Sequence, residues 1–217
     1  MAQAWAQVTG SVALVSDYRF RGVSLSDDRP SAQVEFGYDQ PASGWYVGGV
    51  MSSVRPDQRQ AVQLLGYAGF AQRVLPDLSW EAGVRYSRFT GHEAYAYAEA
   101  YAGLTYKQLV ARVYYAPDYF NVGVSTFYGE LNDSYPLSSR WYVFGHLGYL
   151  RRNGNVDMYP ASRSRSDVRM GLGMALKPCD IQLSWATAHG APEYAFGYPT
   201  STNASRNVWI ISFSYAW

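Results

Sequence analysis

The sequence predicts an all-β fold, a transmembrane antiparallel up-and-down β-barrel of about 12 strands. Three observations predict it. Apolar and polar residues alternate with a period of two along most of the chain, aromatic residues stand at the ends of the apolar faces, and the opposite faces combine charged residues with glycine. Such alternation is typical of strands, because successive side chains point to opposite faces of a sheet.

The alternation can be followed from strand to strand. In the first expected strand, 8–21, apolar residues such as Leu14 oppose charged residues such as Arg19. The segment 93–103 is rich in alanine, but Tyr95, Tyr97, Glu99 and Tyr101 alternate strictly with alanine, and a helix would scatter them over several faces. We expect strands at residues 8–21, 31–40, 44–53, 61–74, 78–89, 94–106, 108–116, 125–136, 140–151, 166–177, 180–189 and 207–217.

The connections between these strands alternate in length. Short turns are expected around residues 41–43, 76–77, 107, 137–139 and 178–179, and the intervening connections are mostly longer. Short turns on one side and long loops on the other are typical of outer-membrane barrels. No linker-like change of composition occurs, so residues 1–217 are expected to form one domain, with residues 1–7 as a periplasmic N-terminal segment. The small-residue spacing of Ala2, Ala4 and Ala6 resembles the end of a signal peptide.

Composition excludes several other classes of protein. Aromatic residues make up 17% of the 217 residues and charged residues only 16%, whereas disordered chains have the opposite bias. The formal net charge of +1 leaves no basic excess for nucleic acid. No apolar run approaches the ~20 residues of a transmembrane helix. The single Cys179 cannot form an intramolecular disulfide, and the histidines lack the spacing of metal ligands, so we expect neither metal nor cofactor.

Alternation alone does not separate a soluble β-protein from a membrane barrel. In a soluble protein the apolar face points inward, whereas in a membrane barrel it points to lipid and the enclosed face is polar. The even strand number, the terminal aromatic residues and the charged, glycine-containing faces favour the membrane barrel. The aromatic residues expected to face lipid are Tyr18, Phe20, Trp80, Tyr86, Trp209, Phe213, Tyr215 and Trp217.

Several segments resemble a known family. Residues 12–27, Val-Ala-Leu-Val-Ser-Asp-Tyr-Arg-Phe-Arg-Gly-Val-Ser-Leu-Ser-Asp, are similar to the opening motif of the TorF-like family of proteobacterial outer-membrane porins, and shorter pieces at 44–49, 65–69, 99–103, 135–137 and 166–171 resemble it as well. The resemblance implies an outer-membrane barrel that acts as a channel. The chain departs from the family at Gln63 and Leu65, where members often carry acids.

Charged residues on the enclosed face are the candidate site. Arg85, Glu99, Arg112 and Glu130 are expected to form a ladder of alternating charge on four successive strands, because unpaired charges are costly in a low-dielectric wall. This ladder either only fills and stiffens the lumen or forms a charged constriction. The residues expected to line the lumen are Asp17, Arg19, Arg21, Glu35, Asp39, Glu81, Arg85, Glu99, Arg112, Glu130, His146, Asp167 and Arg169.

These features predict a porin-like channel in the bacterial outer membrane that passes ions or small polar solutes by passive diffusion through a narrow charged lumen. Seven acids against five arginines on the enclosed face predict a slight preference for cations. A plugged structural or adhesive barrel that binds partners through its loops is the alternative. Lipid-modifying enzymes of this fold use a Ser–His pair at the lipid face, but His146 is expected inside, so we expect no catalytic residue.

The expected partners follow from the membrane location. They are outer-membrane lipids and lipopolysaccharide, small polar solutes or ions, and the barrel-assembly machinery through the C-terminal aromatic strand, with no nucleic acid. Arg151, Arg152, Arg163 and Arg165 either contact lipopolysaccharide phosphates, which arginine binds through paired hydrogen bonds, or are solvated in a flexible loop. The loop 190–206 either folds inward over the mouth of the barrel or is mobile.

Overall fold

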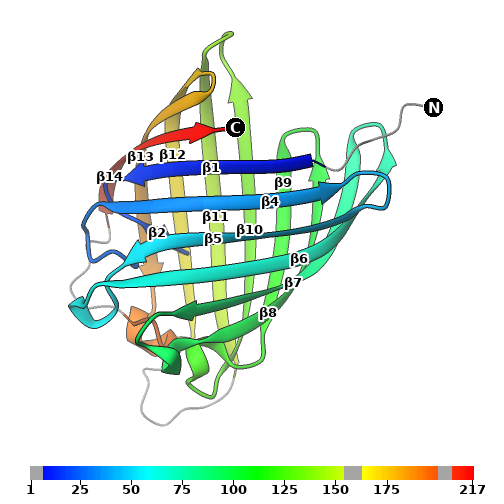
Figure 1. Cartoon of the computed structure of the whole chain (residues 1–217). Helices are drawn as coiled ribbons and strands as arrows, with labels where there is room; N and C mark the ends of the chain where they lie inside the picture. Colours follow the sequence, from blue (N-terminus) through cyan, green and yellow to red (C-terminus); the bar gives the residue numbers. More distant parts are fainter. Residues whose placement is uncertain (1–6, 154–162, 200–206) are drawn as a thin grey trace.

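Twelve strands form a closed antiparallel barrel in a computed structural model that describes residues 7–153, 163–199 and 207–217 (Figure 1). Each strand pairs with its neighbours along the chain, and β1 closes the barrel by pairing with β14. The strands are β1 (Gln7–Val15), β4 (Ser31–Gln40), β5 (Trp45–Val54), β6 (Ala61–Leu75), β7 (Leu78–Phe89), β8 (Tyr97–Tyr106), β9 (Leu109–Ala116), β10 (Ser125–Pro136), β11 (Trp141–Asn153), β12 (Ser164–Leu176), β13 (Cys179–Gly190) and β14 (Asn207–Ala216).

The predicted fold class is confirmed, and the predicted strands match the observed ones closely except for the first. The first strand was expected over 8–21, but β1 ends at Val15. The next residues form a separate two-stranded sheet of β2 (Arg19–Phe20) and β3 (Val23–Ser24). The expected N-terminal segment 1–7 lies outside the described residues except for Gln7, which belongs to β1.

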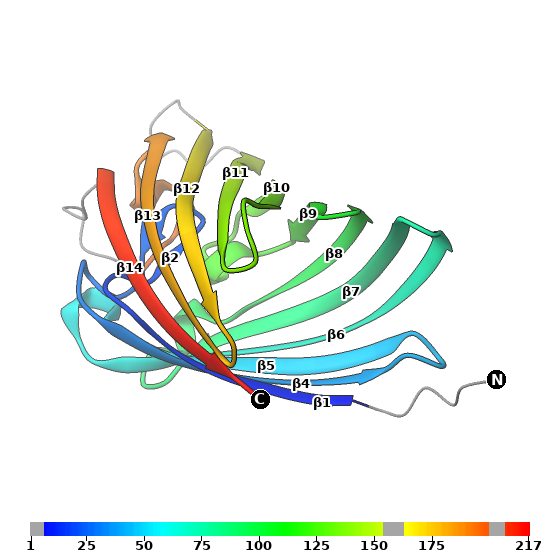
Figure 2. The same cartoon turned by 90° about the horizontal axis from the view of Figure 1, so that it is seen from above.

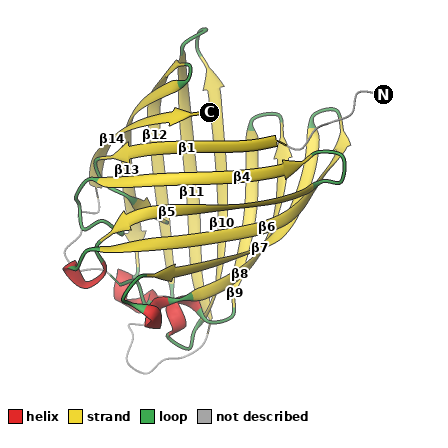
Figure 3. Ribbon diagram, in the orientation of Figure 1, coloured by secondary structure: helices red, strands yellow, loops and turns green. Residues whose placement is uncertain are grey.

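Short turns and long connections lie at opposite ends of the barrel. Turns such as 76–77 and 107–108 join the strands at one end, where β1 begins and β14 ends. In their described parts, the long connections at the other end carry four single turns of 3-10 helix (Figure 3). These turns are η1 (Pro56–Gln58), η2 (Glu93–Tyr95), η3 (Tyr119–Asn121) and η4 (Glu193–Phe196). None of the helical turns in the described residues could span a lipid bilayer.

Apolar side chains cover the outer face of the barrel. Alternate residues along each strand, such as Val84 on β7, Leu131 on β10 and Ile211 on β14, are exposed there. In a water-soluble protein such side chains would be expected in the core. The outer face therefore has the character of a surface that lies against lipid acyl chains.

Large aromatic residues gather near both ends of this outer face. Trp45 and Trp141 begin their strands beside the short turns, and Tyr106 ends β8 there. Tyr149 and Trp209 lie toward the long connections, and Trp209 is 66% exposed. Such belts are typical of the two lipid–water interfaces.

Of the aromatic residues predicted to face lipid, six lie on the outer face. Tyr86, Trp209, Phe213, Tyr215 and Trp217 are exposed there, and Trp80 lies beside outer-face residues such as Leu104 and Val113. The prediction is wrong for Tyr18 and Phe20. Both pack against the buried cluster inside the barrel, because the chain leaves the wall after β1.

Candidate functional site: the barrel lumen

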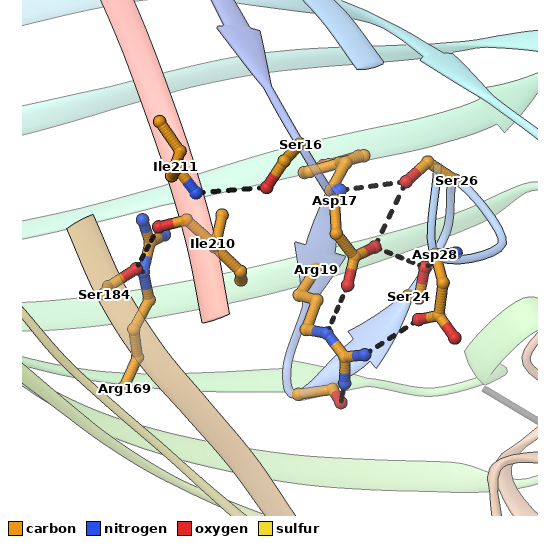
Figure 4. A network of polar contacts seen from close by, with 12 residues as sticks. Ser16, Asp17, Arg19, Ser24, Ser26, Asp28, Arg169, Ser184, Ile210 and Ile211 are labelled. Atoms are coloured by element: carbon orange, nitrogen blue, oxygen red, sulfur yellow. Dashed lines mark hydrogen bonds and ion pairs between the residues drawn. The ribbon is translucent and has the colours of Figure 1, made fainter. Parts of the chain in front are cut away.

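A short hairpin, residues 16–30, lies inside the barrel, where β2 is visible within the ring of strands (Figure 2). Its fold is fixed by Asp17, whose carboxylate accepts hydrogen bonds from Nε of Arg19 at 2.6 Å and from the hydroxyls of Ser24 at 2.6 Å and Ser26 at 3.2 Å (Figure 4). Serine and aspartate side chains favour such local bonds over regular sheet pairing. The hairpin is therefore an ordered part of the lumen.

The hairpin contacts the wall on both sides of β1. Ser16 accepts a hydrogen bond at its hydroxyl from the backbone N–H of Ile211 on β14, at 3.0 Å (Figure 4). The hydroxyl of Tyr18 donates to Oε1 of Gln63 on β6, at 3.0 Å. Burial raises the pKa of Tyr18 to about 12, although a hydrogen bond with Ser52 and the charge of Arg85 oppose the rise. The hairpin is thus held to strands on both sides of β1.

Gly22 is the point at which the hairpin meets β12 and β13. Its φ is +74°, a conformation that glycine adopts without steric cost. A Cβ at this position would lie 2.5 Å from Cβ of Asp167 and 2.8 Å from Cβ of Ala188. Only a glycine lets the hairpin approach the wall this closely.

Arg21 extends from the hairpin to a buried carboxylate on β8. Its Nη2 lies 2.9 Å from Oε1 of Glu99, and the side chains of both residues are almost fully buried. Glu99 also accepts a hydrogen bond from Nε of Arg85 on β7 at 2.5 Å. Burial by itself lowers the pKa of the Arg21 guanidinium, but Glu99 raises it, and the pKa lies well above its ordinary value. Arg21 is therefore charged at neutral pH.

The predicted charge ladder forms only in part. The Arg85–Glu99 pair is present, because the two residues face each other in the β7–β8 register. The predicted Glu99–Arg112 step is wrong. Register places Arg112 opposite Gly103, and its Nε instead donates to Oε1 of Glu81, at 2.5 Å.

Tyrosine hydroxyls satisfy the carboxylates that arginine does not reach. Tyr114 donates to Glu130 at 2.9 Å, and Tyr67 donates to Glu35 at 3.3 Å. Glu130 does face Arg112 across the β9–β10 pair, as expected, but within the described residues the two form no ion pair. The lumen is therefore a mixed network of ion pairs and neutral hydrogen bonds.

His146 and Arg169 lie on the β11–β12 side of the lumen. Nε2 of His146 is 2.8 Å from Oδ1 of Asp167, and its Nδ1 is 2.7 Å from Oδ1 of Asn132. Nε of Arg169 donates to the hydroxyl of Ser184 at 2.9 Å (Figure 4). Among the described residues, Arg169 forms no ion pair with a carboxylate.

Two cavities lie between this network and the short turns. The first, of about 590 Å³, borders Arg21, Tyr128, His146 and Arg169. The second, of about 520 Å³, is lined by acids and tyrosines that include Glu35. Arg85 borders both cavities.

Every residue predicted to line the lumen is inside the barrel, in these cavities or in the hairpin and its ion pairs. They are Asp17, Arg19, Arg21, Glu35, Asp39, Glu81, Arg85, Glu99, Arg112, Glu130, His146, Asp167 and Arg169.

The long-connection end of the lumen is packed. Side chains of the hairpin, of the connection 117–124 and of the connection 191–198 form one buried apolar cluster with the strand ends. Phe120 and Phe196 are fully buried in it, and the hydroxyl of Tyr119 donates to that of Tyr198 at 2.9 Å. In the described part, 191–199, the last long connection therefore folds inward rather than outward.

The arginines expected to face outward divide into two groups. Arg165 is buried and pairs with Glu193, at 2.7 Å from its Nη2 to Oε1. Arg152 is also buried and donates to the carbonyl oxygen of Ala195 at 2.9 Å. The expectation is wrong for these two, because the inward-folded connection supplies their acceptors. Arg151 and Arg163 are exposed.

Sequence reasoning missed several lumen residues. Tyr46 on β5 donates to Oε2 of Glu81 at 2.7 Å and contacts the hydroxyl of Tyr101 at 2.7 Å. Tyr142 donates to Asp180 at 2.8 Å. Alternation places these residues on the enclosed faces, so strand phase alone could have found them. Their partners lie on strands that are not neighbours along the chain, so the register of a single hairpin does not reveal them.

A family model described as "Bacterial protein of unknown function (Gcw_chp)" matches residues 2–215. No curated protein sequence matches the chain. The family match does not confirm the resemblance to the TorF-like porins by name.

Solved structures of porins share the fold at low sequence identity. The chain is similar to the KdgM porin with a TM-score of 0.60 and 9% identity, covering 96% of this chain and 99% of that one. It is similar to the NanC porin with a TM-score of 0.60 and 11% identity, over the same shares of the two chains. A KdgM porin in complex with disordered oligogalacturonate matches with a TM-score of 0.54 and 9% identity, covering 98% of this chain and 99% of that one.

Proposed function

We propose that this chain, which belongs to the Gcw_chp family of bacterial proteins of unknown function, is a narrow outer-membrane channel for ions or small polar solutes. The observation that carries the proposal is the pair of charged cavities enclosed by a barrel whose outer face is apolar. A closed sheet satisfies its backbone groups within the hydrocarbon layer, where water is absent. Polar groups inside such a barrel then provide a path for solutes.

The location and orientation follow the same reasoning. We place the barrel in the bacterial outer membrane, with the short turns in the periplasm and the long connections outside the cell. The likeness in fold to the KdgM and NanC porins supports this assignment. The resemblance of residues 12–27 to the TorF-like porins supports it as well. Outer-membrane lipids, lipopolysaccharide and the barrel-assembly machinery are the partners that this location implies.

The charges of the lumen favour cations. Within the described residues, Glu35, Asp39, Glu130 and Asp180 form no ion pair with an arginine or lysine. Among the described arginines that line the two cavities, Arg169 is the one that forms no ion pair with a carboxylate. The surplus of unpaired carboxylates lowers the energy of a cation in the lumen more than that of an anion.

A plugged barrel is the second candidate, and the buried cluster at the long-connection end favours it. In that case the barrel would act through the surface of its long connections. The cluster and the hairpin fill this end of the lumen, and the hairpin must shift for solutes to pass.

Conductance across a planar lipid bilayer tests the proposal. The purified, folded protein is added to one side of a bilayer in potassium chloride, and neutral sugars of increasing size are then added. Discrete ohmic steps that small sugars reduce are expected of a narrow channel. Folded protein that gives no steps would favour the plugged barrel.

A further inference from the structure

The guanidinium of Arg21 lies in a setting made almost wholly by the barrel wall and one long connection. Its central carbon is 4.2 Å from the ring centre of Tyr128 and 5.2 Å from the ring centres of Tyr114 and Tyr119. The carboxylate of Glu99 lies 2.9 Å from its Nη2. Faces of aromatic rings attract cations, and arginine stacks on them through its planar group.

This setting holds the guanidinium by charge and ring faces more than by hydrogen bonds. Among the described residues, Nε and Nη1 of Arg21 find no hydrogen-bond acceptor. The backbone of Arg21 has a φ of 51°, a left-handed conformation that is unfavourable for residues other than glycine. Arg21 is therefore a strained and incompletely bonded occupant of surroundings that suit its charge and its planar shape.

We propose that Glu99 together with the rings of Tyr114, Tyr119 and Tyr128 forms a binding site for a small solute that carries a guanidinium group, and that Arg21 occupies this site as a tethered substitute. The inference rests on the proposed channel function and names the class of solute. A free guanidinium offers the same charge and planar face as Arg21 without the backbone strain. It competes for the site, and its binding releases the hairpin from β8.

Solutes reach the site from the first lumen cavity. Arg21 and Tyr128 border this cavity of about 590 Å³ on the side away from the short turns. Glu130 borders it as well and adds negative charge on the way to the site. Arg85 also pairs with Glu99 and lies over the ring of Tyr114, with its central carbon 4.2 Å from the ring centre.

Replacement of Arg21 by glycine followed by rescue with a free guanidinium tests the inference. Arg21→Gly removes the side chain and suits a φ of 51°. Methylguanidinium chloride is added to single channels in sodium chloride, with methylammonium chloride as the non-planar cation. We expect methylguanidinium to halve the sodium current of Arg21→Gly at a concentration about tenfold lower than in the wild type or than methylammonium requires.

Arg112→Ala is the matched control. It also removes a lumen arginine that pairs with a carboxylate, but among the described residues no ring lies over its guanidinium. Methylguanidinium should block Arg112→Ala no better than it blocks the wild type. Equal block of Arg21→Gly and Arg112→Ala, or equal block by the two cations, overturns the inference.

Thermal unfolding in detergent micelles separates this inference from the channel proposal. Millimolar methylguanidinium, but not methylammonium, should raise the melting temperature of Arg21→Gly and leave that of Arg112→Ala unchanged. If methylguanidinium raises the melting temperature of Arg21→Gly but no variant conducts, the binding site is supported and the channel proposal is contradicted. If Arg21→Gly conducts and neither current block nor melting temperature distinguishes the two cations, the binding site is contradicted and the channel proposal is supported. If Arg21→Gly folds only when methylguanidinium is present during refolding, the site is supported, and equal failure with both cations overturns it.

Discussion

Arg112 on β9 and Glu81 on β7 form an ion pair across the strand that lies between them. Nε of Arg112 is 2.5 Å from Oε1 of Glu81. Gly103 on β8 faces both residues in the register, and a Cβ at its position would lie 2.9 Å from Cγ of Arg112 and from Oε1 of Glu81. The absence of a side chain at residue 103 lets the two charges meet inside the lumen.

This pair should control the charge selectivity of the second cavity. Glu81→Gln removes one carboxylate and also frees Arg112, whose guanidinium then faces the cavity without an ionic partner. Glu35→Gln removes the same charge from the same cavity but breaks only a hydrogen bond with Tyr67. We expect Glu81→Gln to lower the permeability ratio of potassium to chloride more than Glu35→Gln does, because an unpaired arginine repels cations. Reversal potentials in a salt gradient measure both ratios, and an equal or larger effect of Glu35→Gln would contradict this role of the pair.

Gly22→Ala should displace the lumen hairpin. The new Cβ would overlap the wall at Asp167 and Ala188, which are themselves fixed in strands. Overpacking of this kind costs about 1–3 kcal/mol, in addition to roughly 1 kcal/mol for the positive φ. The hairpin therefore moves away from β12 and β13, and the single-channel conductance should rise.

Gly91→Ala is the control for this substitution. Gly91 has a φ of +69°, but no atom lies within 4 Å of the place where its Cβ would be. This variant carries the backbone cost alone, so its conductance should match that of the wild type. A rise in both variants would show that overlap at the wall is not the cause.

Arginine on the outer face should destabilise the barrel according to its depth. Leu131 lies near the middle of β10, whereas Leu109 begins β9 beside a short turn, and both are exposed on the outside. Leu131→Arg should lower the free energy of unfolding in lipid vesicles by about 2–4 kcal/mol, and Leu109→Arg by about 0–1 kcal/mol. Urea unfolding followed by tryptophan fluorescence measures both values. Equal losses would argue against an outer face that lies in lipid.

Tyr18 should make the stability of the barrel fall at alkaline pH. Burial raises its pKa in the folded protein to about 12, above the ordinary value of 10.0. Between these two values the unfolded chain loses the phenol proton while the folded chain keeps it, so stability falls as the pH rises. The free energy of unfolding should decrease more steeply from pH 10 to pH 12 in the wild type than in Tyr18→Phe, by an amount of order 2 kcal/mol. Parallel curves for the two proteins would mean that Tyr18 keeps its ordinary pKa when folded.

The wall of the barrel could be predicted from the residue pattern alone. A period of two assigns each side chain to one of two faces, and the aromatic ends and charged opposite faces identify which face is outside. Trp209 and Ile211 therefore lie outside as predicted, while Glu99 and Asp167 lie inside. The Arg85–Glu99 pair was also within reach, because a hairpin places neighbouring strands in a register that its turn fixes.

The contents of the lumen could not be predicted from the residue pattern, because they depend on contacts between distant parts of the chain. Residues 16–21 continue the alternation of β1, but the chain leaves the wall after Val15, so Tyr18 and Phe20 point into the interior. A period of two is the same for a strand that faces lipid and for a segment that crosses the lumen. The contact of Arg21 with Glu99 joins residues 78 positions apart, and such a pairing depends on barrel closure, which brings distant strands around one enclosed space.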